Sequence, residues 1–491
     1  MSFVKKLAGE TLIYGMSSIL PRIIHYVVFT IYITRKFEDQ LQYGIYSTLY
    51  AYSSILLVLF LFRMDTAFFR YGSRKEYDQA SVFSSGLIPV GFIALTGVGL
   101  LFLGADAIAG LIKYEGSGYY VRWFAVIIGF DAIAGMFYAK FRLQSRPMRF
   151  LFYRLLNIVV TIGLVLVFLE VFPRIGWGDI LPVKEPIDYV FIANLVASGT
   201  VVLLMLPEIV KTKVTFNLEL WKKMLWYSFP LVIVGIAGNI NQTFSAPLMH
   251  WFLGDDYDAN LTVAGAYNGP AKIAILLNLF AVAFNYAAEP FFFNNAEKKE
   301  SGEAYGQIAH AFAVTAVIVM VGIVAFQEAV ILIVGENYRG PQDIIPILLF
   351  SYLFLGLYYN VSIWYKLSDK TIYGAVIGVT GAVITLVISM IFLPRLGYIA
   401  SAWASLACFG TMLMMGYFLG QKHYPIRYPV RDILFILVVT LVTIVTTIYA
   451  KSFLSGDIAK VFLGMFIFVL FLGILYLTQG KGIKKYLNKS I

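Results

Sequence analysis

Seven ionisable residues lie inside long apolar runs, where a charge is costly and therefore informative. They are Arg22, Arg63, Asp65, Arg122, Asp131, Arg154 and Lys272. An arginine near the centre of a bilayer costs roughly 2.5–3.5 kcal/mol on insertion scales. Such residues usually face a charged partner or a water-filled cavity. Each of the seven is therefore a candidate for binding or coupling.

Arg22 and Lys272 are the two cations predicted to lie near mid-membrane. At 1.5 Å per helical residue, Arg22 lies roughly 18 Å from the inner end of the first apolar run and Lys272 roughly 15 Å from the outer end of the eighth. Two such cations favour an anionic ligand. His25 and Tyr26 follow Arg22 at i+3 and i+4 and share its helix face. Two readings without a ligand remain open: an ion pair between Arg22 and Asp131, and a Lys272 side chain that reaches water.

The other polar candidates also have structural explanations. Four charges lie near a membrane face, where a long side chain extends to water: Arg63, Asp65 and Arg154 at the inner face and Arg122 at the outer face. A group of three amides occurs in the seventh apolar run: Asn239, Asn241 and Gln242. These amides are equally suited to hydrogen-bond a ligand and to hydrogen-bond a neighbouring helix.

Catalytic and metal chemistry find little support in the sequence. The four histidines, at positions 25, 250, 310 and 423, fall in different segments without metal-ligand spacing. Cys408 is the only cysteine, which excludes an internal disulfide and a cysteine-based metal site. No glycine-rich phosphate loop follows a predicted strand, and the predicted outer loops are short. We therefore expect a protein that is not an enzyme and that needs no cofactor and no metal.

Composition and apolar runs set the fold class. The 491 residues are 60% hydrophobic and 13% charged, whereas about 25% of the residues of a soluble domain are charged. The apolar runs are long enough to cross about 30 Å of hydrocarbon as helix. The sequence predicts an all-α polytopic membrane protein with fourteen transmembrane helices. Their approximate bounds are 10–34, 43–69, 81–103, 118–140, 147–170, 187–209, 221–252, 262–289, 304–333, 343–365, 371–393, 397–420, 430–450 and 458–479.

The placement of Lys and Arg predicts that both termini are cytoplasmic, because cytoplasmic loops carry the excess of these residues. The basic segments on that side include 70–75, 140–149, 211–223, 422–431 and 481–489. The formal net charge of +10 is then explained by orientation and by contact with anionic lipid. Nucleic acid is not expected as a partner.

An internal repeat organises the chain. Three pairs of segments match at one offset of 221 residues: GIY at 44–46 with GAY at 265–267, GMFY at 135–138 with GLYY at 356–359, and FPRIGW at 172–177 with LPRLGY at 393–398. The repeat unit is six helices, so its two copies have the same orientation, as in parallel-repeat transporters. We predict a six-helix bundle at 1–212, a second at 213–421, and helices 13 and 14 with a basic cytoplasmic tail at 422–491. Two such bundles predict a central cleft with the ligand near the midplane.

Four stretches carry a resemblance to a known family. They are YGIYSTLYAYSS at 43–54, FRMDTAFFRYGSRK at 62–75, AYNGPAKIAILLNLFAVAFNYAAEPFF at 266–292 and LPRLGYIASAWAS at 393–405. With the six, six and two helices, they make the chain resemble, over essentially its whole length, the polysaccharide flippases of the multidrug/oligosaccharidyl-lipid/polysaccharide (MOP) exporter superfamily.

The resemblance implies a function and roles for particular residues. It implies alternating-access transport of undecaprenyl-diphosphate-linked oligosaccharide (O-antigen, capsule or exopolysaccharide repeat units) from the inner to the outer leaflet of the bacterial cytoplasmic membrane. Membrane lipids and polysaccharide polymerase machinery are the implied partners. Arg22 and Lys272 correspond to cavity cations, and Arg63 with Asp65 to an inner gate. We add His25, Tyr26, Asn241 and Gln242 as candidate substrate-binding residues and Asp131 as the candidate for ion coupling.

Two other functions compete with this one. A cation-coupled multidrug exporter of the same fold would be expected to place acids in its cavity, and Asp131 is the acid available there. A membrane enzyme of polysaccharide assembly would need a substantial segment outside the membrane, which the short outer loops disfavour.

Overall fold

The computed structural model describes residues 24, 29–74, 76–177, 183, 185–213, 215–294, 301–368 and 370–487. These residues form helices joined by short loops, and none of them is in a β-strand. Thirteen helices among them are long and apolar enough to cross a membrane, and they match the predicted helices from the second onward. The predicted first helix, 10–34, lies mostly outside the described residues, and so do Arg22, His25 and Tyr26.

The chain forms two compact units. Unit 1 contains Leu41–Trp251 and Asp255–Thr262, and unit 2 contains Thr30–Gln40, Phe252–Gly254 and the chain from Val263 on. These units are compact bodies rather than repeat copies, so the predicted division of the chain at 212/213 and 421/422 stays a prediction.

Unit 1 holds the helices of the N-terminal half of the chain. They are α3 (Gln40–Leu61), α4 (Met64–Gly72), α5 (Gln79–Leu103), α6 (Ala105–Leu111), α7 (Gly118–Leu143), α8 (Pro147–Leu166), the π-helical η2 (Val167–Val171), α9 (Phe172–Arg174), α10 (Pro186–Val210), α11 (Leu218–Thr243) and α12 (Ser245–Phe252). Within the unit, α7 packs against α5, α8 and α10. Helices α5 and α8 carry many exposed apolar side chains, as expected of helices that face lipid.

Side chains at the helix ends explain where several unit 1 helices begin. Asp78 precedes α5 and accepts a hydrogen bond from the backbone N–H of Ser81 at 3.0 Å. Asn217 does the same for Leu220 at the start of α11, also at 3.0 Å. Glu185 and the side chain of Asp188 form a reciprocal capping box at the start of α10. These contacts satisfy backbone donors that have no partner within the first turn of a helix.

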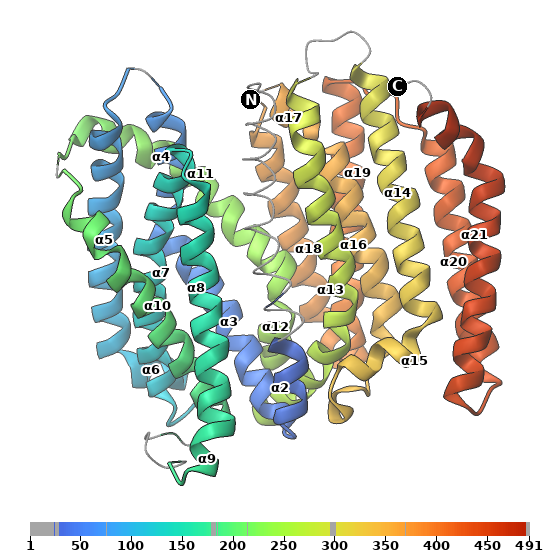
Figure 1. The fold of residues 1–491 in the computed structure, drawn as a ribbon, viewed down its shortest axis with the longest axis horizontal. Coiled ribbons are helices and arrows are strands. Elements are labelled where there is room, and N and C mark those ends of the chain that lie inside the picture. The colour runs from blue at the N-terminus through green and yellow to red at the C-terminus, as the bar shows by residue number, and fades with distance from the viewer. Residues whose placement is uncertain are drawn as a thin grey trace. The chain divides into compact units, whose positions relative to one another are not determined.

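Unit 2 holds most of the C-terminal half of the chain. Its helices are α2 (Thr30–Lys36), most of α13 (Tyr257–Asn294), α14 (Ser301–Ala325), α15 (Gln327–Val330), η3 (Ile331–Ile333), η4 (Glu336–Tyr338), α16 (Ile344–Val361), α17 (Ile363–Leu367), α18 (Ile372–Leu396), α19 (Ile399–His423), α20 (Val430–Ser452) and α21 (Asp457–Leu487). Figure 1 shows α20 and α21 as an antiparallel pair beside α14. A buried hydrogen bond of 3.0 Å between His310 and Gln479 joins α14 to α21.

The helix pairings of the two units correspond as the repeat predicts. In unit 1, α5 contacts α7, α7 contacts α10, and α8 contacts α10. In unit 2, the matching helices make the matching contacts: α14 with α16, α16 with α19, and α18 with α19. Tyr46 and Tyr267, which occupy the same place in the two repeats, are both buried, at 7% and 2% exposure. They therefore differ from tyrosines that line a membrane interface.

Several predicted helices are interrupted: in unit 2, 304–333 at Phe326 and 343–365 at Ser362, and in unit 1 the following two. The predicted helix 43–69 consists of α3 and α4, separated at Phe62 and Arg63, both of which have positive φ. The predicted helix 221–252 consists of α11 and α12, separated at Phe244. Neither of these two breaks in unit 1 follows a glycine or a proline, the residues that usually signal one in a sequence.

Candidate functional site

The break between α3 and α4 is the first feature of the candidate site in unit 1. Phe62 and Arg63 have φ values of 47° and 53°, a left-handed conformation that costs non-glycine residues on the order of 1–3 kcal/mol each. The carbonyl of Arg63 accepts a hydrogen bond of 3.3 Å from the hydroxyl of Ser228 on α11. The packing of α11 therefore helps to hold the strained backbone, and the break redirects the Arg63 side chain.

The guanidinium group of Arg63 lies against the backbone of α11. A Cβ atom added to Gly235 would lie 2.4 Å from Nη2 and 2.7 Å from Nε of Arg63. The absence of a side chain at position 235 is therefore what makes room for the guanidinium. A glycine three residues on, Gly238, faces open space, so the close approach is specific to Gly235.

Asp65, the second residue of the predicted gate, is in the first turn of α4 and is half-buried. A carboxylate there interacts favourably with the positive end of the helix dipole. The hydroxyl of its neighbour Thr66 lies 3.4 Å from Oδ1. Arg70, the other cation close to Asp65 in the sequence, lies over the ring of Tyr227 on α11, 4.3 Å from its centroid. The role of Arg63 and Asp65 as a gate stays a prediction.

The three amides near the end of α11 do not form one patch. Asn239 donates a hydrogen bond of 2.8 Å to the backbone carbonyl of Ser54 on α3, and it thereby joins two helices of unit 1. Asn241 is buried at 6% exposure, whereas Gln242 is exposed. Of the two candidates for substrate contact, Gln242 is thus the accessible one, and the binding role of both stays a prediction.

Asp131 belongs to a polar network inside unit 1. The hydroxyl of Ser198 on α10 donates to Oδ1 of Asp131 at 2.9 Å, and Asn157 on α8 donates to Ser198 at 3.4 Å. The positive charge of Arg154, one turn before Asn157, also acts on Asp131. Sequence reasoning missed Ser198 and Asn157. The signal that could have found them is depth, because Asn157, Ser198 and Asp131 all lie near the middle of their helices, α8, α10 and α7.

Two further arginines have partners within unit 1. The guanidinium of Arg154 lies over the ring of Tyr138, 4.2 Å from its centroid. Arg122 forms an ion pair with Asp106 at 2.5 Å. Both residues were predicted to extend toward water, and the exposure of Arg154 agrees with this.

Lys272 is in unit 2, where it lies within α13 and is half-buried. It follows the first residue of α13 by 15 positions, roughly 22 Å at 1.5 Å per residue. Its neighbours Ala271, Ile273 and Ala274 are buried. The structure thus gives unit 2 a cation at mid-helix depth. The described residues contain no group of three or more His, Cys, Asp or Glu side chains that could hold a metal ion.

A family model described as "Polysaccharide biosynthesis protein" matches residues 7–296, more than half of the chain. The chain belongs to the polysaccharide biosynthesis protein family. No curated protein sequence matches this member of the family.

Solved structures show which fold this polysaccharide biosynthesis protein has. The chain is similar to the lipid II flippase MurJ in an inward closed conformation, with a TM-score of 0.72 and 15% identity, over 95% of this chain and 99% of that one. It is also similar to a multidrug resistance MATE family transporter of the MOP superfamily. A transporter of this description in an inward-facing conformation gives a TM-score of 0.60 at 15% identity, over 84% of this chain and 97% of that one. One in an outward-facing conformation gives 0.58 at 12% identity, over 84% and 95%. The predicted fold is confirmed: the chain has the fold of these transporters, and the thirteen apolar helices among its described residues make it a multi-pass membrane protein.

Proposed function

We propose that the protein is a flippase that moves an undecaprenyl-diphosphate-linked oligosaccharide from the inner to the outer leaflet of the bacterial cytoplasmic membrane by alternating access. The observation that carries the proposal is the family match to polysaccharide biosynthesis proteins over residues 7–296. The fold shared with a lipid II flippase over 95% of the chain supports it. The cargo would be a repeat unit of O-antigen, capsule or exopolysaccharide.

The proposed ligands of the diphosphate are Arg22 and Lys272. The half-buried position of Lys272 within α13 supports its part, because a mid-membrane cation is retained where it meets an anion or water. Arg22 would supply two parallel donors to one phosphate, a geometry that lysine lacks. His25, Tyr26, Asn241 and Gln242 would contact the sugar or the diphosphate, and the lipid tail would stay in the bilayer.

Deletion of the gene tests the function. We expect an undecaprenyl-diphosphate-linked glycan to accumulate in the inner leaflet, where mass spectrometry identifies it, and the surface polysaccharide to be lost. Accumulation of an unfinished glycan that lacks its last sugars would instead indicate an assembly enzyme, and it would contradict the flippase.

Variants at the two cations test the site. Arg22→Ala and Lys272→Ala should each abolish or greatly reduce export while inserting normally. Lys272→Met keeps the volume of the side chain and removes its charge, whereas Lys272→Arg keeps the charge. We expect Met to behave like Ala and Arg to retain part of the export, as Arg22→Lys should. Wild-type export by both alanine variants would refute the diphosphate site without refuting the family assignment.

The membrane potential is the proposed energy source. With a negative cytoplasm, outward movement of two negative charges gains roughly 4–5 kcal/mol per 100 mV. The emptied cationic cavity is drawn inward by the same potential. Flipping in proteoliposomes under a potassium-diffusion potential of either sign, without a proton or Na⁺ gradient, tests this. We expect the rate to rise or fall with the sign of the potential.

A cation-coupled exporter is the second candidate, favoured by one observation. The carboxylate of Asp131 is held by Ser198 at 2.9 Å in a chain that shares its fold with multidrug transporters. Three results together would assign this mechanism. The transport rate would be the same for either sign of the potential, transport would require a proton or Na⁺ gradient, and the Asp131→Asn variant would lose that requirement. Ser198→Ala is the companion variant, because it removes the hydrogen bond and keeps the charge.

The orientation follows from the same proposal, with both termini in the cytoplasm. The segment 255–260, which includes the start of α13, would then be outside. In a Cys408→Ala background, a cysteine at position 258 should react with an impermeant reagent added to intact spheroplasts. Labelling only from the cytoplasmic side would reverse the orientation.

A further inference from the structure

A cavity at one end of unit 1 is lined by lysines and by two aromatic rings. Its volume is about 250 Å³, and its lining comes from α4, the start of α5, the end of α7 and the segment that follows α10. The residues that define its chemistry are Lys140, Gln144, Gln79, Phe83, Thr212 and Lys213. The gate and the Asp131 network do not include any of these side chains, so the cavity is separate from the candidate site described above.

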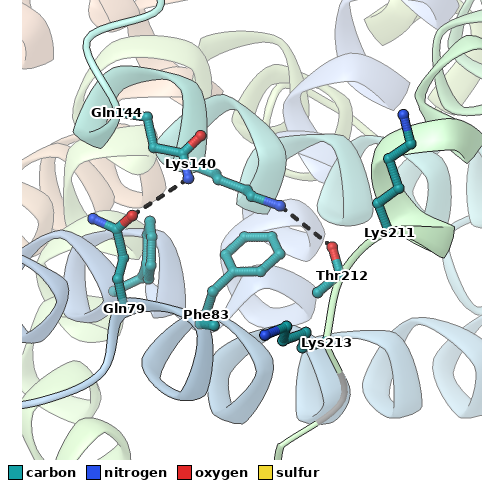
Figure 2. Close-up of a pocket in the computed structure, with 9 residues that line it drawn as sticks. Gln79, Phe83, Lys140, Gln144, Lys211, Thr212 and Lys213 are labelled. Carbon is teal, nitrogen blue, oxygen red and sulfur yellow. Dashed lines mark hydrogen bonds between the residues drawn. The ribbon is translucent and has the colours of Figure 1, made fainter.

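Lys140 gives the cavity a cation that is held in place. Its Nζ lies 3.3 Å from the hydroxyl of Thr212 and 4.6 Å from the centroid of the Phe83 ring. Figure 2 shows Lys140 reaching across Phe83 toward Thr212, Lys213 below the Phe83 ring, and Lys211 turned away. The nearby carboxylate of Glu208 forms an ion pair with Arg149. The charge of Glu208 also acts on Lys140, but none of the described residues that line the cavity is acidic, so the lining itself is positively charged.

Two amides add a hydrogen-bonding requirement. Gln144 donates to Oε1 of Gln79 at 3.3 Å. Its own Oε1 is buried and receives no hydrogen bond from any described residue. A buried polar atom of this kind usually has a partner. If the oxygen and nitrogen of the Gln144 amide were exchanged, a donor would lie at this position instead of an acceptor. A ligand that carries both hydroxyls and phosphate oxygens can pair with the amide in either orientation.

The size and the depth of the cavity narrow the class of ligand. Sites for drug-sized ligands have about 300–1,000 Å³, so 250 Å³ suits a small polar group. The 26 residues of α7 give a helix of roughly 39 Å, longer than the hydrocarbon thickness of about 30 Å. Lys140 lies in the last turn of α7, so we expect it near the phosphates of the lipid headgroups.

The repeat supplies an internal contrast. At the offset of 221 residues, the position that matches Lys140 is Val361. Val361 lines a cavity of about 240 Å³ among α14, α16, α19 and α20, where the lining is apolar except for two tyrosines. The polarity of the unit 1 cavity is therefore a property of its side chains and not of the helix packing.

We propose that this cavity binds the headgroup of an anionic phospholipid that carries hydroxyls next to its phosphate. Lys140 and Lys213 neutralise the phosphate, the Gln144 amide bonds a headgroup hydroxyl, and Phe83 contacts the adjoining carbons. Basic pockets between membrane helices bind anionic headgroups in this way. A soluble phosphate ester has the same chemistry, and the lipid is favoured because the cavity is lined at the ends of helices that are long and apolar enough to cross a membrane.

Native mass spectrometry of the purified full-length protein tests the proposal with phosphatidylglycerol as the probe. Phosphatidylcholine, which has no headgroup hydroxyl and no net charge, is the comparison lipid. The Lys140→Met/Lys213→Met variant removes both cations. Lys222→Met is the matched control, because Lys222 is an exposed cation of unit 1 outside the cavity. Gln144→Glu is nearly isosteric and adds a negative charge, so it tests the site without a change in packing.

We expect phosphatidylglycerol to bind at least ten-fold more tightly than phosphatidylcholine. Each lost lysine should weaken its binding about five-fold, since an interfacial cation contributes about 1 kcal/mol, and Gln144→Glu should weaken it at least as much. Lys222→Met should change it less than two-fold. Equal affinities in the double variant and the control, together with wild-type affinity in Gln144→Glu, would overturn the site. Displacement of the lipid by an equal concentration of glycerol 3-phosphate would overturn the lipid assignment and give the cavity to a soluble phosphate ester.

Discussion

Arg63 in unit 1 and Lys451 in unit 2 both bring a cation to a helix end, and the structure holds them in opposite ways. Lys451 donates to the carbonyls of Val324 and Ala325, at 3.1 and 2.8 Å, and forms an ion pair with Glu328 at 2.5 Å. Its three ammonium protons thus meet three acceptors, two of them at the C-terminus of α14, where the helix dipole favours a cation, and one on α15.

Arg63 has none of these advantages. It precedes the N-terminus of α4, where the dipole disfavours a cation, and its backbone is left-handed. Within the described residues, its guanidinium makes no hydrogen bond or ion pair, and it rests against Gly235. A cation with every donor satisfied fixes two helices together, whereas one held by packing alone can exchange partners. We therefore propose a structural role for Lys451 and a role in movement for Arg63.

Replacing Lys451 by methionine should have the largest effect, as a loss of stability. Removal of one member of a buried ion pair costs about 3–5 kcal/mol, because the other charge stays buried. Thermal unfolding of the detergent-purified protein measures this loss. Lys460→Met is the matched control: its Nζ lies 3.9 Å from Asp457 and the pair is more exposed, so the loss should be about 0.2–1 kcal/mol.

The double variant Lys451→Met/Glu328→Leu sharpens this test. It removes the charge that the single variant leaves buried, so it should recover part of the lost stability. Equal melting temperatures for Lys451→Met and Lys460→Met would contradict the anchoring role of Lys451.

Gly235→Ala should have an intermediate effect, as a loss of transport without a loss of stability. The added Cβ would displace the guanidinium of Arg63, whose Nη2 lies 2.4 Å from the ideal Cβ position. Misplacing a working group by about 1 Å can cost about 100-fold, and we expect a loss of about ten-fold in export. The helix itself should gain roughly 0.5–1 kcal/mol, as exchange of glycine for alanine in a helix usually gives.

Gly238→Ala is the control on the same helix, since a Cβ there meets open space. It should gain the same stability and keep wild-type export. If Gly235→Ala also exported at the wild-type rate, the position of the Arg63 guanidinium would have no part in transport.

The transmembrane spans were predictable because about 20 apolar residues in a row leave few alternatives to a membrane helix. The bounds of α5, α10 and α20 differ from the prediction by two residues or fewer. The break at Phe62 and Arg63 was not predictable, since both residues are tolerated in a helix. It depends on Ser228 and Gly235 of α11, which lie more than 160 positions away in the sequence.

Candidate charges could be found from the sequence, whereas their partners could not. Burial cost alone singles out Asp131 in an apolar run. Its bond to Ser198 depends on how α7 and α10 pack, which the sequence does not specify. The lysine cavity was missed for a related reason. In the sequence, Lys140 and Lys213 belong to basic segments whose charge explains the orientation of the chain. Only the packing of the helices brings them together with Thr212 around one cavity.

Asp65→Asn should have a smaller effect than Lys451→Met and Gly235→Ala. It tests whether movement at the break between α3 and α4 needs a second charge besides Arg63. Asp65 is one turn from the strained residues and near the positive end of α4. We propose that it pairs with a basic group of the opposite bundle when the inner side is closed. A partly exposed pair contributes about 0.2–1 kcal/mol, so export should fall roughly two- to five-fold with normal expression. Asp78→Asn is the control, because asparagine caps α5 as well as aspartate does. Full export by Asp65→Asn would leave Asp65 as a solvated helix-end charge, and Arg63 would then be the one charge of the gate.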